Sequence, residues 1–222
     1  MRLLFLSNTH GNTNEEVIRI LKSWVSSDRK VAYFSSSPDP SRKYFADVAD
    51  WFNDTVGLGN MVYLDAHSSP EEITGLRNAG AIYLSGGNTY HLLRALRDTG
   101  AAELIHQLAM GTETPIIGVS AGGLCLTGDI RAATAENDIG VVNFAGLGLV
   151  DFGFYPHYKS EELCITEINS FMGLSNISEV LAVPEYSGFT VTEIGLTPLG
   201  EVVRFIKGSK NPETILARSK EN

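Results

Sequence analysis

The sequence predicts an α/β protein, a single three-layer α/β/α domain over residues 1–222 with a mostly parallel sheet. Short apolar runs alternate with segments whose apolar residues recur at helical spacing. This alternation is typical of right-handed βαβ crossovers, which place helices on both faces of a parallel sheet. Of the 222 residues, 43% are hydrophobic, enough for one substantial core. No internal repeat or Pro/Ser-rich linker divides the sequence.

The first elements follow this pattern closely. A strand over Leu3–Leu6 precedes a helix whose caps lie within Asn12–Glu15, and a strand over Val31–Phe34 precedes a helix that Ser41 can cap. Apolar side chains fall on one face of each helix. They are Val17, Ile20, Leu21, Trp24 and Val25 in the first helix and Tyr44, Val48, Trp51 and Phe52 in the second.

Three more strands complete the predicted parallel sheet: Met61–Leu64, Ala81–Leu84 and Ile116–Val119. A helix opening at Pro70 lies between the first two strands, because Pro is favoured in the first turn of a helix. Two further helices, over Tyr90–Leu96 and Ala102–Met110, precede the last strand.

After Gly128 the pattern becomes less regular. Glycine and aromatic residues crowd residues 146–158, and one helix is expected over Glu161–Phe171. The strands expected here lie near a sheet edge and are Val180–Val183, Thr190–Ile194 and Glu201–Ile206.

Composition and charge exclude several functions. The formal charge of −9 argues against binding of nucleic acid or an anionic membrane. Cys125 and Cys164 fit no disulfide framework or zinc spacing, so we expect reduced thiols and no metal or organic cofactor. The N-terminal apolar run stops at Ser7, too early for a signal peptide, and no stretch approaches the ~20 apolar residues of a membrane span. We therefore expect a cytoplasmic protein.

Gly118–Gly122 reads G-V-S-A-G, which fits the G-x-S-x-G nucleophile elbow. An apolar strand precedes it and a helix start follows, as this turn requires. Ser120 would then project its hydroxyl above the sheet, and the Ala121 amide at the helix N-terminus could stabilise an oxyanion. Gly86 and Gly87 end another strand and could supply a second amide, while Asn88 is interpreted mainly as a helix cap.

A serine nucleophile needs a base and an orienting carboxylate. His157 is the predicted base, because it follows a predicted strand within an aromatic segment that would exclude water. His10 follows the first strand and is a candidate substrate contact. The carboxylate candidates are Glu185, which follows an apolar strand, and Asp138, in a loop. His67, His91 and His106 are interpreted as solvated or structural.

Together, these motifs resemble the peptidase E (aspartyl dipeptidase) family of serine peptidases. They are Gly86–Thr89, Gly118–Gly122, Pro156–His157 and Val183–Glu185, in this order. The resemblance implies a class I glutamine-amidotransferase-like fold and no cofactor. Its implied roles are Ser120 as nucleophile, His157 as general base, Glu185 as third member, and the Gly87 and Ala121 amides as oxyanion hole. Asp138 matches an Asp-containing loop and is the alternative acid or a substrate contact.

The sequence departs from this family where an acidic substrate would bind. Aspartyl specificity needs a cation, ideally a bidentate arginine. Residues 132–203 contain no arginine, and Lys159 is the only cation at the start of the helix after His157. Arg131 or Lys159 could substitute, so hydrolysis of other short peptides is nearly as plausible as cleavage of Asp-X.

The sequence therefore predicts a hydrolase of short peptides that works through an acyl-enzyme intermediate, as a monomer or homodimer. The alternatives are an esterase, a cyanophycinase-like peptidase, and a non-catalytic small-molecule binding module on a flavodoxin-like sheet.

Overall fold

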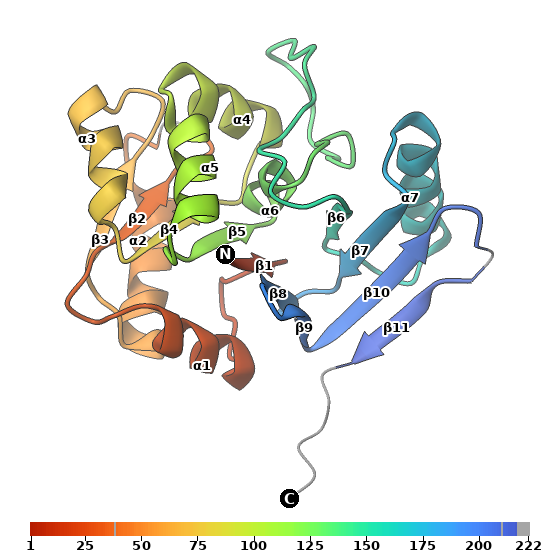
Figure 1. Cartoon of the computed structure of the whole chain (residues 1–222), viewed down its shortest axis with the longest axis horizontal. Coiled ribbons are helices and arrows are strands. Elements are labelled where there is room, and N and C mark those ends of the chain that lie inside the picture. Colours follow the sequence, from red (N-terminus) through yellow and green to blue (C-terminus); the bar gives the residue numbers. More distant parts are fainter. Residues whose placement is uncertain (38, 210, 217–222) are drawn as a thin grey trace, which may run out of the picture.

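The computed structural model describes residues 1–37, 39–209 and 211–216. Its main feature is a seven-stranded sheet in the order β3-β2-β4-β5-β1-β8-β9 (Figure 1). The first five strands in this order are parallel, and β8 and β9 extend the sheet antiparallel. The strands are β1 (Arg2–Leu6), β2 (Val31–Phe34), β3 (Met61–Leu64), β4 (Ala81–Leu84), β5 (Ile116–Val119), β8 (Gly188–Thr192) and β9 (Gly195–Leu199).

Helices cover both faces of this sheet, which confirms the predicted α/β class (Figure 1). On one face, Leu4, Leu6 and Tyr33 pack in a core with residues of α1 (Glu15–Trp24), α2 (Lys43–Trp51) and its π-helical continuation η1 (Phe52–Val56). On the other face, Leu3 and Phe34 pack in a core beneath five helical segments. These are α3 (Pro70–Thr74), η2 (Gly75–Asn78), α4 (Thr89–Asp98), α5 (Ala101–Gly111) and α6 (Ala121–Leu126).

A second, four-stranded sheet lies beside the large one, in the order β11-β10-β7-β6 (Figure 1). It consists of β6 (Gly153–Pro156), β7 (Glu179–Val183), β10 (Glu201–Ile206) and β11 (Glu213–Leu216), with α7 (Glu162–Leu174) between β6 and β7 in the chain. The expectation that β7 and β10 lie near an edge of the main sheet is therefore wrong. An apolar run specifies a buried strand but not its partner, and here β7 pairs with β6 and β10.

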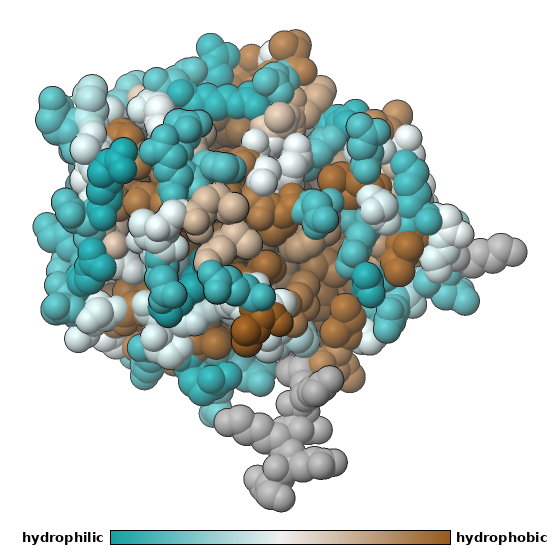
Figure 2. All heavy atoms as spheres, viewed as in Figure 1, coloured by the Kyte–Doolittle hydropathy of each residue, from teal (hydrophilic) through white to brown (hydrophobic). Residues whose placement is uncertain are grey.

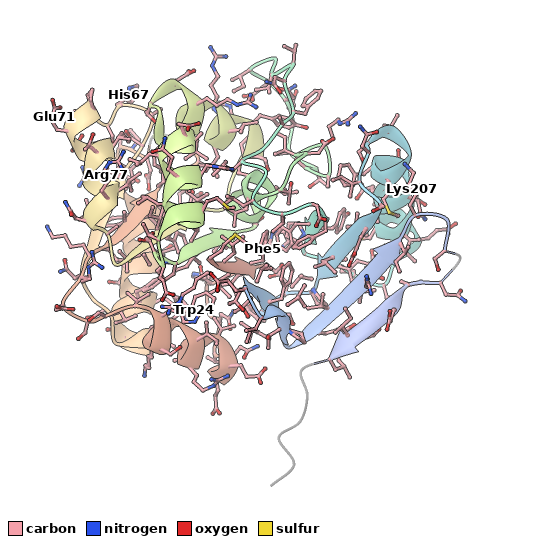
Figure 3. The ribbon with its side chains drawn as sticks, viewed as in Figure 1. Phe5, Trp24, His67, Glu71, Arg77 and Lys207 are labelled. Carbon is pink, nitrogen blue, oxygen red and sulfur yellow. The ribbon has the colours of Figure 1, made fainter. Side chains whose placement is uncertain are left out.

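Aromatic packing joins the two sheets. Phe5 of β1 lies near the centre of the molecule (Figure 3), and its ring stacks on that of Phe189 at 4.7 Å between centroids. Phe154 of β6 lies 5.3 Å from Phe5, so β6 is packed directly against the large sheet. Figure 2 shows hydrophobic residues in the middle of this face and hydrophilic residues over the surrounding helices.

Two details differ from the sequence-based expectation. The strand expected at Thr190–Ile194 is β8 (Gly188–Thr192), because β8 and β9 form a hairpin whose turn leaves Ile194 96% exposed. Tyr44 is 72% exposed although it lies at helical spacing with the buried Trp51, since it projects from α2 into a cavity. In the described part of the chain, no helix has the length and apolar character needed to cross a membrane.

Candidate active site

Ser120 sits on a sharp turn between β5 and α6. Its backbone has φ 49° and ψ −108°, a conformation that L-residues rarely adopt. The Ser120 N–H donates to the Leu6 carbonyl at 2.9 Å, and the Ser120 carbonyl accepts from the Leu124 N–H at 3.0 Å. These bonds hold the turn between β1 and the first turn of α6. The strand, turn and helix expected around Ser120 are all present.

The glycine after this turn is required by close packing. A Cβ at Gly122 would lie 2.1 Å from the Leu84 carbonyl oxygen, closer than non-bonded atoms can approach. The Gly122 N–H donates to the Ser85 carbonyl at 3.0 Å, so α6 begins directly against the end of β4. The turn after β4, which contains Gly86 and Gly87, therefore lies beside Ser120.

A continuous chain of hydrogen bonds links Ser120, His157 and Glu185. Ser120 Oγ lies 2.9 Å from His157 Nε2, and His157 Nδ1 lies 2.6 Å from Glu185 Oε1. A carboxylate can only accept, so Nδ1 carries the proton and Nε2 is free to accept the Ser120 hydroxyl proton. The side chains of His157 and Glu185 are 46% and 45% exposed.

The His157 side chain is thus more exposed to water than we expected from the aromatic residues around it in the sequence. Tyr155 and Tyr158 turn into the core, where they are 5% and 6% exposed, and do not cover the imidazole. The expectation that this segment would exclude water is wrong, because Tyr155 packs toward α7, where its hydroxyl donates to Glu167, and Tyr158 packs edge-on against Phe205 of β10.

The small sheet brings His157 and Glu185 together. β6 and β7 are parallel, with Pro156 paired to Val183, so the residues that follow the two strands emerge side by side. His157 comes one residue after this pair and Glu185 two residues after it. Parallel strands therefore present both side chains at one edge, although the edge belongs to the second sheet.

Ser7, which the sequence analysis did not single out, anchors His157. It is fully buried at the end of β1, and its Oγ accepts from the His157 N–H at 2.8 Å. The same oxygen lies 3.4 Å from His157 Nδ1. His157 has φ 57°, so this bond holds an uncommon backbone conformation. A polar residue directly after a buried strand at the ligand-binding edge is the signal that could have identified it.

The proposed oxyanion donors lie beside Ser120. Gly87 has φ 116°, and a Cβ there would lie 2.1 Å from Ser36 Oγ, so this position needs glycine. Ala121 is the first residue of α6, where backbone N–H groups have no partner within the helix. Among the described residues, neither the Gly87 nor the Ala121 N–H donates a hydrogen bond to another protein group.

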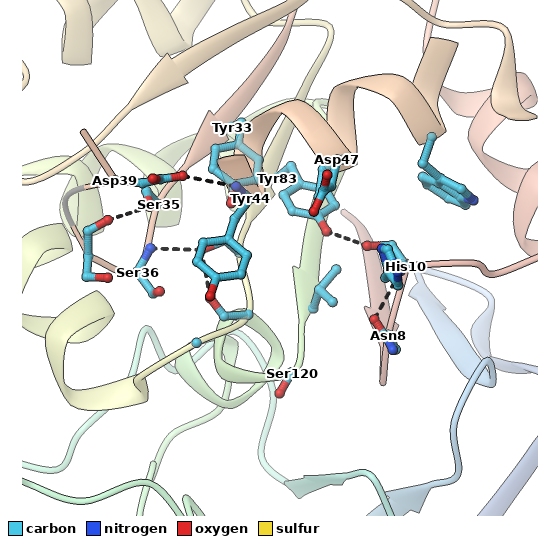
Figure 4. Close-up of a pocket in the computed structure, with 18 of the residues that line it drawn as sticks. Asn8, His10, Tyr33, Ser35, Ser36, Asp39, Tyr44, Asp47, Tyr83 and Ser120 are labelled. Carbon is cyan, nitrogen blue, oxygen red and sulfur yellow. Dashed lines mark hydrogen bonds between the residues drawn. The ribbon is translucent and has the colours of Figure 1, made fainter. Parts of the chain in front are cut away.

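A cavity of about 680 Å³ opens at the carboxyl ends of the parallel strands (Figure 4). The turns after β1, β2, β4 and β5 and one face of α2 form its walls, and Ser120 and His157 lie in its lining. Ligands of open parallel sheets bind at this edge. His10 and Asn88 also line the cavity.

Asn88 and Asp138 make structural contacts. Asn88 Oδ1 caps α4 by accepting from the Tyr90 and His91 N–H groups, and its Nδ2 donates to the Glu136 carbonyl at 2.9 Å. Asp138 Oδ1 lies 2.8 Å from His91 Nε2. The structure therefore brings Glu185, and not Asp138, to His157, and it gives His91 a partner where we expected a solvated side chain.

The two cations that the sequence suggested as partners of an acidic substrate lie outside the cavity lining. Neither Lys159 nor Arg131 lines the cavity. The Arg131 guanidinium pairs with Asp129 and donates to the Leu174 carbonyl. Over residues 1–37, 39–209 and 211–216, no group of three or more His, Cys, Asp or Glu side chains is placed to hold a metal ion.

The fold and this site define a class of α/β proteins in which a serine occupies a strand–turn–helix elbow beside an imidazole. The model of Peptidase family S51 matches residues 3–197, most of the chain. The chain belongs to Peptidase family S51, which confirms the resemblance drawn from the motifs.

Two relatives illustrate the sequence similarity. A peptidase E of Nostoc sp. is 32% identical over 166 residues, which cover 72% of this chain and 66% of the relative. A Drosophila melanogaster protein with the provisional name alpha-aspartyl dipeptidase is 35% identical over 127 residues, covering 54% of this chain and 48% of that protein. The matches thus span between about half and two thirds of these relatives' length.

Two crystal structures share the fold. A candidate peptidase E protein from Listeria monocytogenes EGD-e superposes with a TM-score of 0.62 at 21% identity, covering 98% of both chains. A peptidase from an acI-B1 Actinobacterium superposes with a TM-score of 0.74 at 14% identity, covering 98% of this chain and 95% of the other.

Proposed function

We propose that this protein is a serine-type peptidase that hydrolyses short peptides. The observation that carries the proposal is the hydrogen-bonded chain from Ser120 through His157 to Glu185. Membership of Peptidase family S51 and similarity to proteins named peptidase E support it.

In the first half of the reaction, His157 Nε2 accepts the Ser120 hydroxyl proton while Ser120 Oγ attacks the scissile carbonyl carbon. The carbonyl oxygen becomes an oxyanion, and the Gly87 and Ala121 N–H groups stabilise its charge. Glu185 keeps the Nδ1 proton in place and stabilises the imidazolium. His157 then donates its Nε2 proton to the leaving amine, and an acyl-enzyme remains.

In the second half, water replaces the amine. His157 accepts a proton from the water, whose oxygen attacks the acyl carbon, and the proton returns to Ser120 Oγ as the acid product leaves. The half-exposed imidazole gives water direct access to this step.

Replacement of the nucleophile tests the proposal. Ser120→Ala should lower kcat for dipeptide hydrolysis by about 10⁴-fold or more. The Tm should change by no more than about 2 °C, because the hydroxyl is not buried in the core. A fluorophosphonate should label the parent protein at Ser120 and leave the variant unlabelled. Hydrolysis at the parent rate by the alanine variant would contradict the assignment.

A substrate panel separates the alternatives. Short peptides and p-nitrophenyl esters, compared by kcat/KM, distinguish a peptidase from an esterase. A folded protein that neither hydrolyses these compounds nor reacts with the fluorophosphonate would instead favour a non-catalytic binding module.

A further inference from the structure

The cavity beside Ser120 has an unbalanced charge. Among the described residues that line it, Asp39 and Asp47 carry carboxylates and none is Lys or Arg. The lining also contains two histidines, His10 and His157. The His157 ring is already hydrogen-bonded to Ser120 and Glu185. A substrate carboxylate that entered here would meet like charge without a lysine or arginine to pair with it.

The two carboxylates differ in what they already bind. Asp39 is committed to the start of α2, since its Oδ1 accepts from Ser41 Oγ at 2.7 Å and its Oδ2 from the Tyr44 N–H at 3.0 Å. The Asp47 carboxylate makes no hydrogen bond or ion pair with any residue that the structure describes. Asp47 is therefore the carboxylate available to a ligand.

The surroundings of Asp47 suit a cation on an apolar stem. Tyr44, Asp47, Val48 and Trp51 lie at i, i+3, i+4 and i+7, so α2 presents them on one face, which lines the cavity. Tyr44 and Asp47 are labelled in Figure 4. Aromatic rings beside a carboxylate favour ammonium and guanidinium groups through cation–π attraction and cover the methylene stem.

The tyrosines deeper in the cavity leave this negative charge unchanged. Burial raises the pKa of Tyr33 to about 12 and also raises that of Tyr83. Both phenols are therefore neutral at physiological pH. Lys43 is the first residue of α2 and Arg42 directly precedes it, but neither lines the cavity. The Arg42 guanidinium lies 4.8 Å from the Tyr63 ring centroid.

We propose that this cavity selects substrates that carry an ammonium or guanidinium group, with Asp47 as the counter-charge and Tyr44 and Trp51 as the apolar contact. The inference deepens the proposed function and rests on it for the role of Ser120. The selected group is either the free amino terminus of the peptide or a basic side chain. The expected preference is opposite to the acidic preference implied by the resemblance to aspartyl dipeptidases.

Matched dipeptides distinguish these two sources. Arg-Ala against citrulline-Ala, and Lys-Ala against norleucine-Ala, test a basic side chain at constant shape. Ala-Ala against acetyl-Ala-Ala tests the amino terminus. We expect the cationic member of at least one comparison to have the higher kcat/KM, by about fivefold, as for a partly exposed ion pair. Asp-Ala should be hydrolysed more slowly than Ala-Ala.

Two substitutions at position 47 in α2 test whether Asp47 causes the preference for cationic substrates. Asp47→Asn should remove the preference for the cationic member, and Asp47→Lys should shift it toward Asp-Ala. Asp50→Asn is the matched control, because Asp50 is an exposed carboxylate on the same helix that does not line the cavity. Equal preferences in Asp47→Asn and Asp50→Asn, or a parent enzyme that favours Asp-Ala, would overturn the inference.

Binding measurements test the selection of a cation independently of the proposed peptidase activity. Calorimetry on Ser120→Ala should show tighter binding of the cationic than of the neutral member of the selected pair. Turnover without a charge preference would overturn only the inference. Absence of both turnover and Ser120 labelling would overturn the proposed function, and the binding comparison would still decide whether the cavity selects a cation.

Discussion

Three residues in or next to the candidate site have positive φ angles: Ser120, His157 and Tyr186, the residue after Glu185, with φ of 49°, 57° and 61°. Such conformations cost of order 1 kcal/mol each for residues other than glycine. Hydrogen bonds from neighbouring elements hold two of them, because Leu6 accepts from the Ser120 N–H and Ser7 from the His157 N–H. The unfavourable backbone conformations therefore lie just after strands, at the residues whose side chains form the candidate site or lie next to it.

Ser7 is expected to act as a positioning residue for His157. Ser7→Ala removes the acceptor of the His157 N–H, so the imidazole should lose its alignment with Ser120. We expect kcat to fall about tenfold with KM nearly unchanged, because a single neutral hydrogen bond contributes about 0.5–1.5 kcal/mol. Steady-state kinetics measure this split.

Ser187→Ala is the control for Ser7→Ala. Ser187 is also buried and its carbonyl accepts from the Ser7 N–H, but its hydroxyl makes no hydrogen bond to His157. An equal loss of kcat in both variants would show that Ser7 acts through general packing and not through His157.

Glu185 and Asp138 can be compared by isosteric substitution. Glu185→Gln should lower kcat by about 10²-fold or more, because a neutral amide stabilises the imidazolium less and can favour the wrong tautomer. Asp138→Asn should lower kcat by less than about threefold, since Asp138 contacts His91 and not His157. Comparable losses, or the reverse order, would move the acid to Asp138.

Among the elements, β6 connects the core to the site. It carries Phe154, which is fully buried against Phe5 and Phe189, and it ends at Pro156, directly before His157. The packing of the Phe154 ring thus determines the position of the His157 imidazole. The register of β6 with β7 then sets where Glu185 meets it.

Truncation of Phe154 should therefore affect stability and activity together. Phe154→Ala removes a fully buried ring and should lower the free energy of unfolding by about 3–5 kcal/mol. The kcat should fall as well, because β6 loses its support. Urea unfolding and peptide hydrolysis measure the two effects. Leu174→Ala, at a 71% exposed position at the end of α7, should change stability by less than about 0.5 kcal/mol.

For the whole molecule, the sequence predicted what local patterns determine. The five parallel strands were identified because each is a short apolar run between turns, and Ser120 because its motif lies between such a strand and a helix. The small sheet was not predicted, since strand pairing depends on contacts distant in the sequence. Ser7 and Asp47 were missed for the same reason: each becomes notable only through what the fold places beside it.

The stability of the whole molecule should decline in alkali because of Tyr33. This residue of β2 is 3% exposed, and burial raises its pKa from the usual value near 10 to about 12. In the unfolded chain the phenol loses its proton near pH 10, while the folded chain retains it. The stabilisation from Tyr33 is therefore complete below pH 10 and is lost as the pH rises through about 12.

Urea midpoints at pH 9, 10 and 11 measure this effect. The midpoint of the parent protein should fall over this range, and that of Tyr33→Phe should fall less steeply, because phenylalanine has no proton to release. Tyr44→Phe is the matched control, since it removes the same hydroxyl from a side chain that is 72% exposed, so its slope should equal that of the parent. A Tyr33→Phe slope equal to the parent slope would mean that other groups, such as the buried Tyr83, govern the alkaline transition.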